Sequence, residues 1–598
     1  MLSEILDRQP MESLLSGGEG VFCPEAGDPA WDTANPAFRQ EIASLAAVYR
    51  EKPYPMRTAM NFLAFVRSGS RRADEDPYFL RRRKLCVSAL AVCCGDESFL
   101  EDVLDGVWCI CEETSWVISA HNVNPIPGAP AAAEYPLPDP EAPYIDLFAA
   151  QTGMILSLIL RMLGKRLEQI SPVIPGRIRE EIRRRILTPF MKNDDFWWMG
   201  FRRKDLNNWT PWILSNILVC GCLAPLARKR FAALLDRAFR MLDRWLDVMP
   251  EDGGCDEGAG YWNMAGGAML DCLQILENLT GERLTLWDNE KIRNILCFPL
   301  RAEVGNGWFV NFADCDARPF LSGERLQFAG EKLGNPALEA MGSRLRGTIS
   351  DQLNDVPHLT RVLSLLFHPA GETMAAEERE DTWLKDLQLR LVRRGDWTLC
   401  CKGGHNGENH NHNDVGSFML YLQGEPVIVD AGNMVYTAKT FSDQRYTLWN
   451  VRSAYHNVPL IGDREQLPGT AYAAREVVCL PDGLALEMAG AYGNAAIRIY
   501  RSLRVTAEGL TLEDDIRLPE PQRVSWVFLF RNAVTGGEGW LEDARVRLMF
   551  PPGMTCETEE IPIEDSRMAR NYPGSLRRVK VTDGEATERK VRFVLIRK

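Results

Sequence analysis

The sequence predicts a two-domain protein of the α+β class, in which an N-terminal domain of stacked helices is followed by a C-terminal antiparallel β-sandwich. The chain has 598 residues. A single hydrophobic core stops growing at roughly 250–300 residues, so more than one domain is expected. Apolar residues recur with a helical period from about residue 35 to 370 and with a period of two after about residue 380. This change of period separates a helical domain from a β domain.

The helical pattern is clearest between residues 231 and 250, where apolar residues follow the i, i+3, i+4, i+7 rule. Comparable patterns recur over residues 84–94, 146–163, 176–191, 211–223 and 261–279. No sequence repeat of fixed period links them. Successive helices of this kind pack as pairs in a solenoid or in a toroid, and these patterns leave both arrangements open.

Short segments that alternate, or that are rich in β-branched and aromatic residues, fill the second part of the chain. They begin at Leu387, Trp397, Ser417, Arg498, Val524 and Val591, with Gly, Pro and Asp turns between them. Many short strands with no helices between them predict an antiparallel sandwich. Pro369-Ala-Gly and the acidic stretch 377–381 mark the boundary. We therefore expect a helical domain over residues 1–375 and a β-sandwich over residues 376–598.

Composition and charge argue against several classes of partner. The formal net charge is −13, which disfavours non-specific attraction to nucleic acid or to an anionic membrane. The N-terminus carries Glu4 and Asp7 where a signal peptide needs a basic start and an apolar run. The 16 cysteines are scattered along the chain, as is typical of reduced thiols. We expect a cytoplasmic protein without a nucleic-acid or membrane partner, and the sequence leaves its oligomeric state open.

Histidines gather in one stretch of the β domain. Four of the seven in the chain, His405, His410, His412 and His456, lie between residues 405 and 456, and Asp430 lies among them. Each buried imidazole needs a hydrogen-bond partner, so this crowding favours a functional site over a core. His412, Asp430 and His456 are a reasonable ligand set for zinc, with the fourth position left for water. A hydrogen-bonded loop cluster without metal explains the spacing equally well.

An ordered series of motifs resembles a known family. It consists of His410-Asn-His412-Asn-Asp-Val-Gly-Ser-Phe, Val429-Asp430-Ala-Gly, Arg445-Tyr446 and Ser453-Ala-Tyr-His456-Asn-Val-Pro, with Gln466 nearby. The series resembles the heparinase II/III-like group of polysaccharide lyases, which includes heparin lyases and exolytic oligoalginate lyases. The resemblance implies an (α/α) toroid followed by antiparallel β-sheets. That architecture agrees with the change of period and extends the resemblance, in outline, over most of the chain.

The resemblance also implies roles for individual residues. Asn207-Asn208-Trp209-Thr-Pro-Trp is similar to the segment in which the family neutralises the substrate carboxylate, which makes Asn208 the neutraliser. Residues 250–262 are similar to the segment that carries the catalytic tyrosine, which makes Tyr261 the acid or base. His410 takes the place of the catalytic histidine. His412, Asp430 and His456 take the places of the metal ligands, so the resemblance implies a structural or site-organising Zn²⁺.

A second phenol and several substrate contacts complete the expected site. In the alginate-cleaving branch a tyrosine soon after the metal aspartate matters, and Tyr446 is the candidate, ahead of Tyr436. Tyr261 ranks above Tyr446 as the essential phenol. We expect substrate contacts from His121, Asn207, Trp209, Glu257, His405 and Arg445.

β-Elimination from a uronic acid sets the chemical demands on these residues. The C5 proton must leave while the sugar carries a carboxylate, so that carboxylate has to be neutralised first. A tyrosine with a pKa of about 10 acts as a base near neutral pH only after a downward shift of roughly three units, or ~4 kcal/mol. We expect a cation to cause it, namely Arg445, a protonated histidine or the metal. Tyr261 and His410 can then approach C5 from opposite faces.

The sequence therefore predicts a lyase that cleaves uronate-containing glycans of the heparin/heparan sulfate or alginate type. Its partner is an acidic oligosaccharide, and action on imported oligosaccharides favours an exolytic mode. One alternative is a toroid glycoside hydrolase that uses paired carboxylates among Asp252, Asp256 and Glu257. Another is a carbohydrate-binding protein that has lost catalysis.

Overall fold

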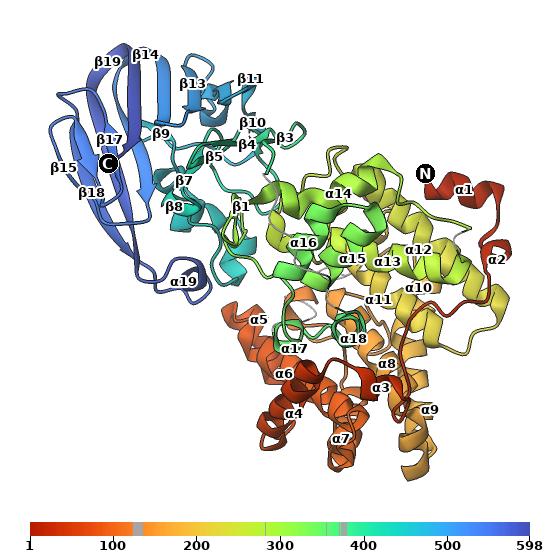
Figure 1. Cartoon of the computed structure of the whole chain (residues 1–598). Helices are drawn as coiled ribbons and strands as arrows, with labels where there is room; N and C mark the ends of the chain where they lie inside the picture. Colours follow the sequence, from red (N-terminus) through yellow and green to blue (C-terminus); the bar gives the residue numbers. More distant parts are fainter. Residues whose placement is uncertain (123–135, 282, 355, 370, 372–378) are drawn as a thin grey trace. The chain divides into compact units, whose positions relative to one another are not determined.

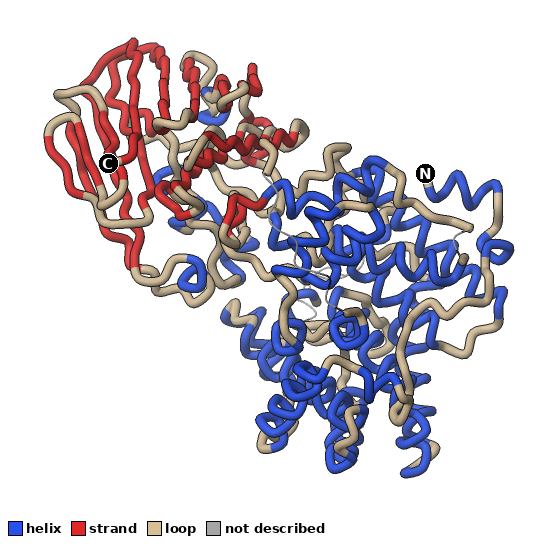
Figure 2. Tube along the Cα trace, in the orientation of Figure 1, coloured by secondary structure: helices blue, strands red, loops and turns tan. Residues whose placement is uncertain are grey.

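The computed structural model describes residues 1–122, 136–281, 283–354, 356–369, 371 and 379–598. They form two compact units. The first, here called the helical unit, comprises Met1–Met249, Asn263–Leu296 and Leu321–Ala376. The second, the sandwich unit, comprises Pro250–Trp262, Cys297–Phe320 and Glu377–Lys598. Figure 1 labels the elements, and Figure 2 separates the helices of the first unit from the strands of the second.

The helical unit is built from helices joined by connections of varied length. They are α1 (Leu2–Arg8), α2 (Met11–Leu14), α3 (Ala30–Thr33), α4 (Pro36–Arg50), α5 (Ala59–Ser68), α6 (Arg72–Cys93), α7 (Leu100–Cys111), α8 (Leu147–Ile170), α9 (Val173–Ile182), α10 (Thr188–Lys192), α11 (Trp209–Leu223), α12 (Arg228–Val248), α13 (Gly266–Thr280), α15 (Gly323–Leu333), α16 (Pro336–Arg344), α17 (Ile349–Leu353) and α18 (Leu359–Phe367). Helix α14 (Glu290–Ala302) crosses the boundary between the units.

Neighbouring helices pack against one another, as the helical periodicity predicts. Helix α11 contacts α8, α12 and α13, and α6 contacts α4, α7 and α8. Helices α8 and α11 are buried along most of their length, whereas α12 buries one apolar stripe that includes Leu234, Met241 and Trp245. Among the described helices, α8 alone has the length and apolar composition of a membrane span, with a mean hydropathy of 1.5 over a window that is 78% buried inside the molecule. A core helix passes the same test.

The sandwich unit contains antiparallel strands. They are β1 (Glu303–Gly305), β2 (Trp308–Phe309), β3 (Thr382–Leu384), β4 (Leu389–Arg394), β5 (Trp397–Lys402), β6 (His405–Asn406), β7 (Phe418–Leu422), β8 (Glu425–Ile428), β9 (Pro459–Ile461), β10 (Gly469–Ala473), β11 (Arg475–Leu480), β12 (Gly483–Glu487), β13 (Arg498–Val505), β14 (Gly509–Phe530), β15 (Thr535–Gly537), β16 (Trp540–Glu542), β17 (Val546–Met549), β18 (Thr555–Pro562) and β19 (Ser575–Arg597). A short helix, α19 (Met568–Asn571), precedes the last strand.

The two longest strands, β14 and β19, pair with each other at the centre of the main sheet. The order of the main sheet is β15-β16-β17-β19-β14-β8-β7-β5-β4-β3, and β13, β12 and β11 extend it from β14. Register shifts between Arg517 and Val524 bend β14, whose first half pairs with β13 and whose second half pairs with β8 and β9. Strands β12 and β13 then lie against β4 and β5. The alternation of exposed and buried residues in β13 shows one face turned to this core.

Two segments that the sequence analysis placed in the helical domain belong to the sandwich unit. Between Cys297 and Phe320, apolar residues such as Val304 and Phe312 join a core cluster with Met419 and Tyr421 of β7. All residues of β7 are buried, so both faces of this strand are covered. Residues 297–320 cover the face that carries Met419 and Tyr421. The segment Pro250–Trp262 lies on that cover, where the backbone N–H of Gly260 donates to Cys315 Sγ at 3.4 Å. Residues 250–262 and 297–320 thereby reach the histidine-rich loops.

A buried ion pair is expected to hold the sandwich together. Arg501 and Asp514 are 1% and 0% exposed, with Nη2 of the arginine 2.8 Å from Oδ2 of the aspartate. Replacing Arg501 by Met leaves Asp514 as an unpaired buried charge, which costs ~3–5 kcal/mol. We expect hydrogen exchange at amides of β13 and β14 to accelerate accordingly. Arg517→Met, beside the exposed Asp515 at 4.0 Å, is the control and should change the opening free energy by less than ~0.5 kcal/mol. Equal exchange in the two variants would contradict this assignment.

Candidate active site

Tyr261, Tyr436 and His410 form a chain of polar groups in the sandwich unit. Tyr261 ends the helical turn η5 (Ala259–Tyr261), and its hydroxyl lies 2.5 Å from the hydroxyl of Tyr436. The hydroxyl of Tyr436 lies 3.4 Å from Nδ1 of His410. The imidazole ring lies 5.1 Å from the ring of Tyr261 and 5.8 Å from that of Tyr436, centroid to centroid. The hydroxyl of Tyr436 therefore connects the hydroxyl of Tyr261 to the imidazole of His410.

Asp314 anchors the row of polar groups formed by Tyr261, Tyr436 and His410. No sequence motif marked this residue. The residue is 2% exposed. Its Oδ2 lies 3.1 Å from His410 Nδ1 and 2.9 Å from Arg445 Nη2, and its Oδ1 lies 3.1 Å from His412 Nε2. Burial alone would raise the pKa of Asp314, but hydrogen bonds to His410 and His412 and the charge of Arg445 hold that pKa well below its usual range. The carboxylate is thus charged and links the catalytic-histidine position to the metal-ligand position.

The backbone of His410 is held in an unusual conformation. Its φ of 54° lies in the left-handed region, which residues other than glycine rarely adopt. Arg445 supports the turn, because Nη2 donates to the carbonyl of His410 at 2.9 Å and Nε donates to the carbonyl of Asn411 at 3.2 Å. Its Nη1 donates to the carbonyl of Thr440 at 3.2 Å. Arg445, which we expected to bind substrate, thus directs donors from all three nitrogens to the protein and positions His410.

Burial and two carboxylates set the electrostatics of His410. Burial alone would lower the pKa of His410, but the hydrogen bond to Asp314 and the charge of Glu257 outweigh it, and that pKa is raised. Oε1 of Glu257 lies 3.6 Å from His410 Nε2. Glu257, expected from the sequence as a substrate contact, therefore lies against the imidazole.

The phenols differ from the sequence-based expectation. We expected a cation to lower the pKa of Tyr261, but burial raises that pKa well above its usual value, and the neighbouring Tyr436 and Glu257 raise it further. Burial also raises the pKa of Tyr436. The guanidinium of Arg567 lies 5.2 Å from the ring centroid of Tyr436, and the charges of Arg567 and Arg445 both lower the pKa of Tyr436 without offsetting burial. Both phenols therefore keep their protons at neutral pH.

Arg567 is a second site residue that the sequence analysis missed. It directly precedes α19 and pairs with Asp316, whose Oδ2 lies 3.2 Å from Nη2. Its charge lowers the pKa of Tyr261 and of Tyr436 against the larger effect of burial. No motif marked this arginine, because its partners lie far away in the sequence.

His412, Asp430 and His456 converge as the sequence predicts. One ligand atom from each lies within 4.8 Å of the others, and all three residues are buried. Oδ2 of Asp430 lies 2.9 Å from His456 Nδ1, and its Oδ1 lies 4.0 Å from His412 Nδ1. In the described part of the chain, His412 Nδ1 and His456 Nε2 are buried without a hydrogen-bond partner. Since an unpaired buried nitrogen is costly, these atoms fit a metal ion.

The two imidazoles of the triad have pKa values shifted in opposite directions: burial alone would lower the pKa of His456, but the charge of Asp430 raises it. Burial lowers the pKa of His412, which keeps this imidazole neutral and able to bind a cation. Burial alone would raise the pKa of Asp430, but His456 and His412 hold it below its usual value. Asp314 adds the second contact of His412, which is the arrangement that orients metal-binding histidines in proteins.

Four expected residues lie in the helical unit. Asn208 is the N-cap residue of α11 and is buried, while the side chain of Asn207 accepts from the backbone N–H of Trp209 at 3.1 Å. The ring of Trp209 lies 4.8 Å from that of His121, which stacks on Phe148 at 5.3 Å. Nδ1 of His121 lies 2.8 Å from Asp146 Oδ2. The structure thus brings His121 and Trp209 together beside the cap residue Asn208.

Two expected residues contact other groups. The hydroxyl of Tyr446 donates to Asn411 Oδ1 at 2.8 Å, and it is Tyr436 that reaches Tyr261 and His410. Nδ1 of His405 accepts from the backbone N–H of Gly407 at 3.1 Å. Within the described residues, neither Tyr446 nor His405 contacts the chain of Tyr261, Tyr436 and His410.

Known proteins share this architecture. A heparinase III, 12% identical, covers 95% of this chain and 93% of its own with a TM-score of 0.60. The heparan sulfate lyase HepC from Pedobacter heparinus, 12% identical, covers 93% and 88% with a TM-score of 0.57. A mutant of the chondroitin AC lyase of Streptomyces coelicolor A3, 14% identical, covers 95% and 80% with a TM-score of 0.51. The fold is therefore an (α/α) toroid followed by an antiparallel β-sandwich, which confirms the predicted class.

A protein-family model matches the C-terminal part of the chain. Residues 376–568 match the model described as Heparinase II/III-like, C-terminal. No curated protein sequence matches the chain. The chain carries a heparinase II/III-like C-terminal domain, and the resemblance found in the sequence is confirmed over that range.

Removing the charge of Asp314 should destabilise the site. In Asp314→Asn, the buried Arg445 loses its carboxylate partner, which costs ~3–5 kcal/mol. We expect faster hydrogen exchange at amides of residues 405–415 and 440–447, measured by mass spectrometry on the full chain.

The control is Asp443→Asn, which removes a carboxylate from an exposed position of the same unit. Its exchange should match that of the unaltered protein to within ~0.5 kcal/mol. Unchanged exchange in Asp314→Asn would show that this carboxylate does not hold the site.

Proposed function

We propose that the protein is a polysaccharide lyase that cleaves glycans containing uronic acid by β-elimination. The observation that carries this proposal is the contact of two protonated phenols, Tyr261 and Tyr436, with each other and with the imidazole of His410. It supplies an acid and a base side by side, as elimination requires. The family domain and the similar heparinase III, heparan sulfate lyase and chondroitin AC lyase support the same class of reaction.

In the proposed reaction, the neutral form of His410 acts as the base and Tyr261 as the acid. The imidazole takes the C5 proton, the electron pair forms the C4–C5 double bond, and the bond between C4 and the leaving O4 breaks. Tyr261 gives its proton to O4. The hydroxyl of Tyr436 lies between the two groups, 2.5 Å from Tyr261 and 3.4 Å from His410. It can therefore return the proton from the imidazole to Tyr261 after each turnover.

The substrate carboxylate needs a hydrogen-bond donor, and we assign that role to Asn208. Its side chain belongs to the start of α11, next to the aromatic pair of His121 and Trp209. A donor positioned at developing negative charge is worth ~3–4 kcal/mol. His121 and Trp209 offer ring faces and one imidazole edge to a sugar.

We assign Zn²⁺ to His412, Asp430 and His456, where two buried nitrogens have no hydrogen-bond partner among the described residues. Two imidazoles and a carboxylate are a common zinc ligand set. When bound, the ion would supply positive charge and rigidity to the histidine loops, a structural or site-organising role.

The substrate is an acidic oligosaccharide of the heparin/heparan sulfate or alginate type, and we propose exolytic action on imported oligosaccharides in the cytoplasm. The 16 cysteines all occur as free thiols, which suits a reducing compartment. The hydrolase alternative gains no support from Asp252 and Asp256, since each accepts backbone N–H groups, of Gly254 and of Asn409 respectively.

Three tyrosine variants test the mechanism. Tyr261→Phe and Tyr436→Phe should each lower kcat by ~10²–10⁴-fold, because they remove a proton donor or its relay. Tyr446→Phe is the matched control and should keep activity within a few-fold. Activity is followed by the ultraviolet absorbance of the unsaturated product on heparan sulfate, chondroitin, hyaluronan and alginate oligosaccharides.

The pattern among the variants discriminates between assignments. Loss of activity in Tyr446→Phe with retention in Tyr436→Phe would move the second phenol to Tyr446. Near-normal turnover by Tyr261→Phe would overturn the acid assignment. Absence of the absorbance with every glycan, while reducing ends accumulate, would favour a hydrolase.

Metal analysis tests the zinc assignment. The protein purified without chelator should contain about one zinc per chain by mass spectrometry of the element, in keeping with one three-residue ligand set. His412→Ala and His456→Ala should lose it and melt at a lower temperature. His405→Ala, which removes a histidine outside the triad, should retain it. Zinc-free wild-type protein would contradict the assignment.

A further inference from the structure

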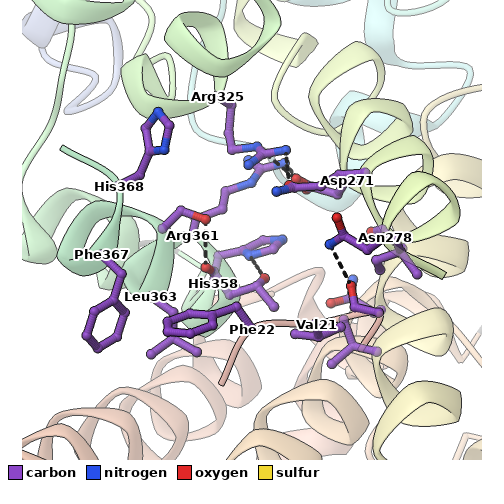
Figure 3. Close-up of a pocket in the computed structure, with 18 residues that line it drawn as sticks. Val21, Phe22, Asp271, Asn278, Arg325, His358, Arg361, Leu363, Phe367 and His368 are labelled. Atoms are coloured by element: carbon purple, nitrogen blue, oxygen red, sulfur yellow. Dashed lines mark hydrogen bonds and ion pairs between the residues drawn. The ribbon is translucent and has the colours of Figure 1, made fainter. Parts of the chain in front are cut away.

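A polar cavity lies within the helical unit (Figure 3). All of its lining residues belong to that unit, and none is a site residue expected from the sequence. They come from α11, α13, α15 and α18 and from the segment 20–22. The cavity measures about 220 Å³. This is below the ~300 Å³ at which pockets for drug-sized ligands begin, so the cavity suits a ligand of about monosaccharide size.

Two buried arginines share one aspartate in this cavity. Nε of Arg325 lies 2.9 Å from Asp271 Oδ1, and Nη2 of Arg361 lies 3.1 Å from Asp271 Oδ2. The arginine side chains are 4% and 6% exposed. One carboxylate cannot balance two guanidinium charges, so the cluster carries an excess of positive charge in a place with little water.

The other ionisable groups nearby do not fully remove this excess. Burial raises the pKa of Glu324 to about 7, so this carboxyl is only partly ionised at neutral pH. Burial lowers the pKa of His358 well below its usual value, which keeps it neutral. Glu331 pairs with His368 at 3.2 Å. The two arginines therefore keep an excess of positive charge that an anionic ligand can meet.

Donors and an apolar wall are available to a ligand. Nη2 of Arg325 donates to Gln274 Oε1 at 2.8 Å, while its Nη1 has no hydrogen-bond partner among the residues that the structure describes. Hydroxyl and amide side chains, including Ser364, add further polar groups to the lining. Figure 3 shows Phe22 and Phe367 across from the arginines, and their rings meet edge to face at 5.3 Å.

We propose that this cavity is a second ligand site, which binds a small monoanionic sugar acid. The carboxylate of the ligand meets Arg325 and Arg361, its hydroxyl groups meet the amide and hydroxyl side chains, and its ring lies against Phe22 and Phe367. The planar guanidinium groups of the two arginines match a planar carboxylate well, which favours a carboxylate ligand. The aromatic wall favours a sugar ring over a simple carboxylate such as acetate. This site is separate from the lyase chemistry and does not depend on it.

Isothermal titration of the full chain with sodium glucuronate tests the proposal. We expect saturable binding of one glucuronate at this site, and at least tenfold weaker binding of glucose and of acetate. Gln274→Glu places a negative charge next to Arg325 with almost no change of shape, and should weaken glucuronate at least tenfold. Ser364→Trp fills the cavity and should give the same loss.

Gln40→Glu makes the same charge change at an exposed position of α4 and should bind as the unaltered protein does. His410→Ala alters the proposed lyase site and should leave this binding intact. The proposal is overturned if the unaltered protein does not bind glucuronate, if Gln274→Glu and Ser364→Trp bind it normally, or if His410→Ala alone abolishes binding.

Discussion

The carboxylate of Asp314 is the contact on which the arrangement of the site depends. It lies within 3.1 Å of His410, His412 and Arg445, and it is almost fully buried. One oxygen faces the proposed base, and the other faces a proposed metal ligand. A shift of the Asp314 carboxylate therefore changes the hydrogen bonds of both His410 and His412. Arg445 closes the arrangement by holding the left-handed turn at His410 through backbone carbonyls. Its guanidinium also pairs with Asp314 at 2.9 Å.

Packing explains why the site is assembled from segments distant in sequence. The outer face of β7 is apolar and needs a cover, which residues 297–320 provide. Residues 250–262 lie on that cover. Residues 297–320 and 250–262 thereby place Asp314 and Tyr261 next to the loops that contain His410 and Tyr436. The same burial that stabilises the cover raises the pKa values of both phenols, so the packing keeps them protonated at neutral pH, as their proposed roles require.

Periodicity was enough to predict the fold class. In amphipathic helices such as α12 and in half-buried strands such as β13, the buried face is visible in the spacing of apolar residues along the sequence. The metal triad could also be predicted from the sequence, since His412, Asp430 and His456 lie close together in one domain. The crowding of histidines already indicated a functional site at His410, but the roles of Tyr261 and His410 were assigned through resemblance. Asp314 and Arg567 were not found, because the contacts that give them meaning are made across 98 and 251 positions of the chain. The raised pKa of Tyr261 depends on burial, which a local motif does not encode.

The central claim is that the reaction is an elimination, in which no water enters the product. The direct test is digestion of uronate oligosaccharides in water enriched in heavy oxygen, with mass spectrometry of the products. The account predicts that neither product gains the label during cleavage, once exchange at the reducing end is subtracted, and that one product carries a C4–C5 double bond. Incorporation of one labelled oxygen per bond cleaved, with two saturated products, would contradict it.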